Sequence, residues 1–189
     1  MSQQLIWRNT EKRWGWISII IHWLSALTVI SLFTLGLWMV DLTYYDDWYR
    51  TAPEIHKSTG ICLLLLTVVY LVWRTRNGKP ASLSTHSAIE IKAARLAHVL
   101  IYVLLLLIIL SGYLISTADG REIVVFSVFE IPATIYGIDQ QEDIAGVVHL
   151  VLAISLMAVV ALHAAGALKH HFIDKDLTLK RMLGIHKLD

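Results

Sequence analysis

The fold is decided by the stretch HLVLAISLMAVVALH, which runs from His149 to His163. Thirteen uncharged, mostly apolar residues separate the two histidine rings. In an α-helix this separation is about 21 Å along the axis and within about 40° of four full turns. The stretch therefore predicts one helix that presents both rings on nearly the same face, at two levels. Ionisable side chains inside so apolar a segment are costly and usually functional.

The composition places this stretch in a membrane. Of the 189 residues, 56% are hydrophobic and only 16% are charged, which is typical of a small polytopic membrane protein. A helix of about 20 mostly apolar residues crosses the hydrocarbon layer. Four stretches of this kind are present, at residues 16–40, 54–73, 94–117 and 146–169. The sequence predicts an all-α fold, a four-helix transmembrane bundle that forms a single membrane domain over residues 1–189.

The connections between these stretches differ sharply in charge. The N-terminal segment, the middle connection and the C-terminal tail hold 13 of the 16 Lys and Arg residues. The other two connections hold Arg50, Lys57 and Arg121 beside ten of the 15 acidic residues. The positive-inside rule therefore predicts that both termini are cytoplasmic. We also expect Thr51 and Glu54 to cap the second helix, and the partly apolar connection 118–145 to lie on the membrane surface or to cap the bundle.

Five of the nine histidines fall in or near the predicted spans, and the topology gives each one a depth. His56 and His149 lie toward the outer side, whereas His22, His98 and His163 lie toward the cytoplasmic side. The remaining four are expected to be solvated in cytoplasmic loops or in the tail; they are His86, His170, His171 and His186.

Two imidazoles that face each other across a helical bundle are typical axial ligands of a b-type haem. Each level offers histidines from separate helices, so two haems would fill the bundle from side to side. Zinc is a weaker alternative, because it prefers four ligands and the outer level offers only two histidines. Depth alone does not choose between His22 and His98 as the partner of His163. Gly60 and Gly166 follow His56 and His163 closely, and small residues there would let a flat macrocycle approach the backbone.

Four motifs give this chain a resemblance to a known family: ISIIIHWLSA, PEIHKSTG, RLAHVLIYVLL and VVHLVLAISLMAVVALHAAGALKHHFIDKDLTLKRM. Over nearly its whole length the chain resembles the bacterial cytochrome b561 family, the four-helix, dihaem, quinone-linked cytochromes of the inner membrane. The resemblance implies two haem b groups with four histidine ligands. His22 and His163 would hold the cytoplasmic-side haem iron, and His56 and His149 the outer one.

Three further residues on the cytoplasmic side are candidates for contacts with quinone or with haem propionates. His98 would be a proton or hydrogen-bond donor there, although a structural bond to a neighbouring helix explains it as well. Arg74 and Arg95 lie at span ends, where arginine pairs with carboxylates such as propionates. Snorkelling to the lipid headgroups explains the two arginines equally well.

The leading functional hypothesis is a membrane cytochrome that exchanges electrons with quinone, with ubiquinone as substrate. One alternative is a superoxide:ubiquinone oxidoreductase at the periplasmic face, because some members of the family oxidise superoxide there and reduce ubiquinone. The acidic outer connections would, however, repel an anion. A periplasmic electron-transfer protein that docks on these acids is the alternative. A non-redox membrane anchor subunit is the alternative of another class. Membrane lipid is an expected partner, and nucleic acid is not.

Overall fold

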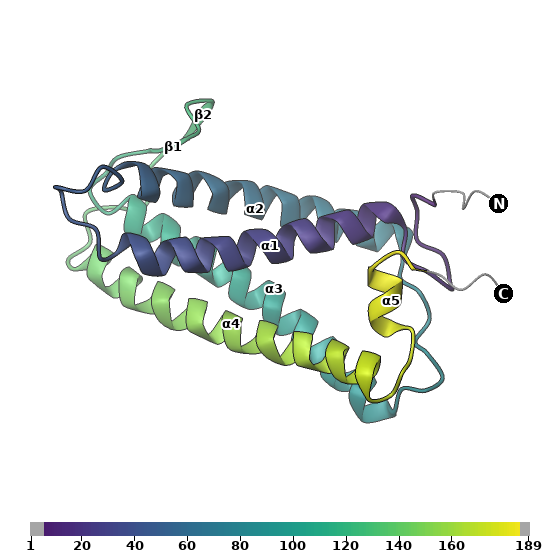
Figure 1. Ribbon diagram of the computed structural model, residues 1–189. Coiled ribbons are helices and arrows are strands. Elements are labelled where there is room, and N and C mark those ends of the chain that lie inside the picture. Colours follow the sequence, from purple (N-terminus) through teal and green to yellow (C-terminus); the bar gives the residue numbers. More distant parts are fainter. Residues whose placement is uncertain (1–5, 186–189) are drawn as a thin grey trace.

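A computed structural model describes residues 6–185, and Figure 1 shows its four long helices side by side. Each is long and apolar enough to cross a membrane. The predicted four-helix bundle is therefore confirmed, and α2, α3 and α4 begin several residues before the predicted spans. The helices are α1 (Trp16–Met39), α2 (Thr51–Asn77), α3 (Ala88–Ser116) and α4 (Gln141–Phe172).

The bundle is built from two helical pairs. α1 packs along α2, and α3 packs along α4, whereas the helices of different pairs contact each other mainly where α2 meets α3. The first and the last described residues lie at one end of the bundle, together with the α2–α3 connection and the short helix α5 (Thr178–Met182). We call this the terminal end. The opposite end, where the α1–α2 and α3–α4 connections lie, is the loop end (Figure 1).

A small leucine cluster joins the two pairs in the middle of the bundle. Leu63 of α2, Leu105 of α3 and Leu156 of α4 are all buried and pack in one hydrophobic cluster. Leu156 lies seven residues from both His149 and His163, so all three share nearly one face of α4. An apolar layer therefore separates the two histidine levels.

The helix starts differ from the expected ones. α2 has Arg50 at its N-cap with no side-chain capping bond, so the predicted cap by Thr51 is wrong. α3 instead begins with a complete capping box, in which Ser87 and Glu90 each accept a bond from the other's backbone N–H. This box satisfies two free N–H groups and explains why α3 begins well before its apolar part.

The α3–α4 connection contains a hairpin that the sequence did not predict. Its strands are β1 (Ile123–Val125) and β2 (Phe129–Ile131), which pair antiparallel. Ile123 and Val125 are buried and pack with Ile61 of α2. The Oγ of Ser58 on α2 accepts a bond from the Phe126 N–H at 3.1 Å. The first strand of the hairpin therefore packs against α2.

Candidate functional site

The structure brings the predicted site histidines together at two levels. At the loop end, His56 of α2 lies beside His149 of α4, with ring centroids 6.2 Å apart and ring planes at 65°. At the terminal end, His22 of α1 lies beside His163 of α4, with centroids 6.3 Å apart and planes again at 65°. We call these the loop-end pair and the terminal-end pair. Each pair joins a helix of the first helical pair to α4 of the second.

The spacing of both pairs fits two imidazoles bound to one metal ion. A bond from an imidazole nitrogen to a metal is about 2 Å long, so two rings on opposite sides of one ion have centroids about 6 Å apart. Two imidazoles joined by a hydrogen bond or stacked face to face would lie closer together, whereas an edge-to-face pair of rings covers the same range. The residues present therefore fit the axial ligation of haem iron at both levels.

His98 lies at the terminal level, as its depth predicted. Its ring is closer to His163 than the ring of His22 is. Its ring centroid is 5.0 Å from that of His163. This distance is short for two rings on opposite sides of one ion, whereas the His22 distance fits. The geometry thus favours His22 as the partner of His163 and leaves His98 beside the pair.

The His149 ring is fixed by neighbours on α3. Its Nδ1 donates to the Ile108 carbonyl at 3.0 Å and lies 3.0 Å from the Ser111 hydroxyl. A carbonyl only accepts, so this contact places the ring proton on Nδ1 and leaves the Nε2 lone pair free. Metal-binding histidines usually donate their second N–H in this way, which fixes the ring orientation.

His56 is held by shape instead of hydrogen bonds. Its Nδ1 is buried and has no hydrogen-bond partner among residues 6–185. A Cβ at Gly36 of α1 would lie 3.2 Å from the His56 ring, and one at Gly112 of α3 would lie 3.2 Å from the His149 ring. Sequence reasoning missed both glycines and Ser111, because glycine and serine in an apolar helix carry no recognisable signal. A Cβ added at Gly60 or Gly166, by contrast, would meet only open space.

The two candidate arginines differ in their surroundings. Arg74 of α2 donates to the Tyr102 hydroxyl at 3.4 Å. Tyr102 lies on α3, one helical turn after His98. Arg95 is exposed, and among the described residues its side chain makes no hydrogen bond or ion pair. Arg74 therefore reaches α3 close to His98, whereas Arg95 makes no such contact among the described residues.

The comparisons with known proteins agree with this architecture. Residues 13–184 match the sequence profile described as prokaryotic cytochrome b561. The chain belongs to the prokaryotic cytochrome b561 family. It is therefore a membrane b-type cytochrome that binds b-type haem, and a multi-pass protein of the bacterial inner membrane.

Similar proteins in this cytochrome family cover nearly the whole chain. Cytochrome b561 homolog 2 of Escherichia coli (strain K12) is 52% identical over 93% of this chain and 94% of its own length. A protein of Yersinia pestis named probable superoxide oxidase CybB is 30% identical over 92% of this chain and 97% of its own. Cytochrome b561 homolog 1 of Escherichia coli (strain K12) is 26% identical over 90% of this chain and 97% of its own length.

One expectation about the other histidines of this cytochrome is wrong. His86 and His170 were expected to be solvated, but their side chains are only 16% and 14% exposed and both approach Asp176. His171 is partly buried, with its Nδ1 inaccessible. His186 lies outside the described residues. The contact between His86 and Asp176 joins segments about 90 residues apart, which no local pattern indicates.

We predict that Gly112→Ala weakens haem binding at the loop-end pair. The new methyl group would force the His149 ring to move by a few tenths of an ångström, and overpacking of this kind costs about 1–3 kcal/mol. Haem per protein, measured by the pyridine haemochrome assay after detergent washing, should fall. Leu162→Ala is the control, because this α4 side chain is 72% exposed and lies on a different face of the helix from His163. Equal haem retention in both variants would contradict the prediction.

Proposed function

We propose that this cytochrome holds two b haems, one at each histidine pair, and passes electrons across the membrane to or from quinone. The observation that carries the proposal is the pair of matching distances, 6.3 Å at the terminal end and 6.2 Å at the loop end. Both pairs use α4, whose two histidines lie about 21 Å apart along the axis. Redox centres at two depths provide a path for electrons through the bundle.

The side chains of the bundle have separate tasks in this function. Haem, when bound, supplies one-electron oxidation and reduction. A histidine from each helix of a pair would hold the iron from both sides and leave no position for oxygen, so these residues would favour electron transfer. Ser111 and the Ile108 carbonyl hold the His149 ring in place. The buried cluster of Leu63, Leu105 and Leu156 excludes water between the two levels.

The orientation in the membrane follows from charge. The positive-inside rule puts the terminal end, with its excess of Lys and Arg, in the cytoplasm. The loop end, with the hairpin and most acidic residues, then faces the periplasm. Electrons enter or leave the loop-end pair from that side.

A quinone headgroup is proposed to bind beside the terminal-end pair. Support comes from the hydrogen-bond donors gathered there, since His98 lies beside His163 and Arg74 reaches Tyr102 on the same face of α3. Ubiquinone is the expected substrate. His98 would donate a hydrogen bond or a proton to the headgroup, or to a haem propionate.

Two donors are candidates at the loop end. The name of the Yersinia relative supports superoxide, and Lys57 follows the loop-end ligand His56 directly. Against superoxide stand the acidic residues, and one of the three bases, Arg121, is already paired with Asp119. A net-negative face slows the approach of an anion and favours a cationic partner. We therefore favour a periplasmic electron-transfer protein as the donor or acceptor.

We predict that the two haems are lost independently. His149→Ala should lose the loop-end haem and keep part of the other, and His163→Ala should do the reverse. The measurement is haem per protein by the pyridine haemochrome assay, with a reduced-minus-oxidised spectrum to show that the remaining haem is redox-active. Two haems retained in both variants would refute the ligand assignment, and a colourless wild-type protein would favour a non-redox anchor.

His98→Ala is predicted to keep two haems. The change should slow haem reduction by quinol or shift the potential of the terminal-end haem, because a donor beside His163 is removed. Stopped-flow reduction and a potentiometric titration measure these effects, with His22→Ala for comparison. One haem in His98→Ala together with two in His22→Ala would reverse the assignment.

The response to salt distinguishes the two donors. A cationic donor protein should reduce the haems about tenfold or more faster at low than at high ionic strength, because opposite charges steer the encounter. Replacing Glu142 and Asp143 by Gln and Asn should remove much of this advantage. Glu11→Gln, at the terminal end, is the control. Fast reduction by superoxide that slows with salt and is lost in Lys57→Ala would instead identify superoxide as the donor.

A further inference from the structure

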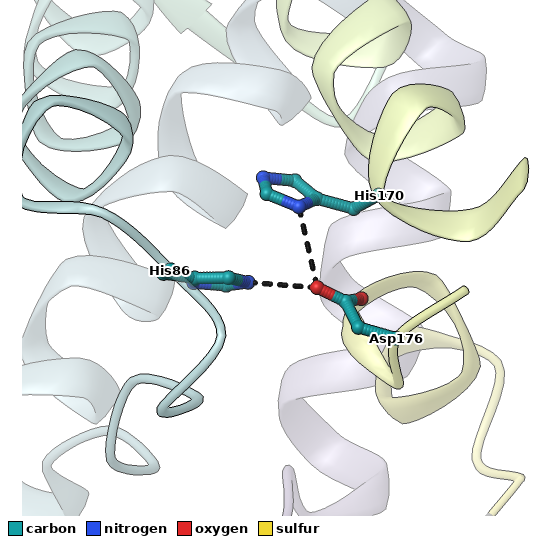
Figure 2. A group of neighbouring side chains, drawn as sticks. All are labelled: His86, His170 and Asp176. Carbon is teal, nitrogen blue, oxygen red and sulfur yellow. Dashed lines mark hydrogen bonds and ion pairs between the residues drawn. The ribbon is translucent and has the colours of Figure 1, made fainter. Parts of the chain in front are cut away.

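A second group of metal-ligating side chains lies at the terminal end, apart from the histidine pairs. Figure 2 shows His86 and His170 pointing toward the same carboxylate oxygen of Asp176. The His86 Nε2 is 3.1 Å from Asp176 Oδ2, and the His170 Nδ1 is 3.2 Å from it. The three residues come from the α2–α3 connection, the last turn of α4 and the segment before α5.

The group is sheltered but not fully satisfied by hydrogen bonds. The Asp176 side chain is 3% exposed. His86 also lies 3.0 Å from the Thr178 hydroxyl, so its Nε2 has partners. The His170 Nδ1 is buried and, among the described residues, neither nearby carboxylate meets it in the direction of a hydrogen bond. This nitrogen lies 2.8 Å from Asp174 Oδ2 and 3.2 Å from Asp176 Oδ2, so it faces two carboxylate oxygens without a well-directed hydrogen bond, an arrangement that a shared cation would explain.

The donor set has the chemistry of a transition-metal site. Two imidazoles and one carboxylate bind zinc and similar divalent ions, often with one position left open. Bonds of about 2 Å in tetrahedral geometry put neighbouring donor atoms about 3.3 Å apart, which is close to both observed spacings. Burial raises the pKa of the Asp176 carboxyl, but bonds from Thr178 and His86 outweigh it, so the pKa lies below its ordinary value. The carboxylate is therefore ionised at neutral pH.

We propose that His86, His170 and Asp176 form a binding site for one divalent metal ion of the zinc class, with the fourth position open to solvent. The three donor atoms all lie within 4.8 Å of one another. Glu90, His170 and Asp174 form an overlapping group that also meets this distance. In that group, Lys169 Nζ already contacts Glu90 at 2.5 Å and Asp174 at 2.9 Å. A cation so close opposes a metal ion there.

A bound ion would fasten the terminal end. It would link the α2–α3 connection to the end of α4 and to the start of α5, segments that otherwise meet through a few contacts such as Arg181 with the Ala81 carbonyl at 3.0 Å. The site shares no residue with the two histidine pairs. Metal binding and haem binding can therefore be measured separately.

The test is zinc binding to the purified, haem-containing protein in detergent, prepared with a tag that contains no histidine. After treatment with a chelator, isothermal titration with Zn²⁺ should show one tight site, and zinc retained after desalting should equal about one per chain. His86→Ala, His170→Ala and Asp176→Asn should each weaken binding about 100-fold or more, since each removes a ligand. Zinc should also raise the melting temperature of the wild type but not of these variants.

Two controls keep the experiment decisive. His171→Ala removes the neighbouring histidine, and Glu90→Gln removes a carboxylate of the overlapping group, and both should bind zinc as the wild type does. X-ray absorption at the zinc edge of the wild type should show two imidazole ligands, and this result does not depend on any variant folding. No saturable zinc binding, or equal loss in Glu90→Gln and Asp176→Asn, would overturn the proposal.

Discussion

One face of α4 sets the arrangement of the whole bundle. His149, Leu156 and His163 follow each other at seven-residue intervals, so a helix presents them in one line. The two rings must meet partners from other helices, because an unpaired ionisable group in the hydrocarbon is costly. The leucine between them packs with α2 and α3. Each helical pair is thereby placed against the other at three depths.

The two histidine pairs have different surroundings although their spacings agree. Glycine packs closely against both loop-end rings and a hydrogen bond to α3 holds His149, whereas the terminal-end pair has a third histidine, His98, beside it. Hydrogen bonding and polarity around the ligands are the protein's means of setting haem potential. If each pair holds a haem, as proposed, these different environments would give the two haems different potentials.

The distribution of charge and the contacts between segments distinguish the same two ends of the molecule. The basic terminal end carries the N-terminal segment, α5 and the α2–α3 connection, joined by contacts such as Asn9 with the Gly78 carbonyl at 3.0 Å. The acidic loop end carries the hairpin on α2. The proposed quinone site lies at the first end, and the proposed charge-steered encounter takes place at the second.

The sequence by itself determined the four helices, the two histidine levels and the asymmetry of charge, because apolar length and helical period are local properties. The sequence could not choose between His22 and His98, because both lie at the same depth and depth does not say how near each ring is to His163. The ring distances favour His22. Sequence reasoning also missed Gly36, Gly112 and Ser111. Each matters only because a histidine from another helix packs against it, and the sequence does not show which helices meet there. Only the tertiary structure brought His86, His170 and Asp176 together. His86 and Asp176 are about 90 residues apart, and the packing that joins a loop, a helix end and a turn leaves no regular spacing in the sequence.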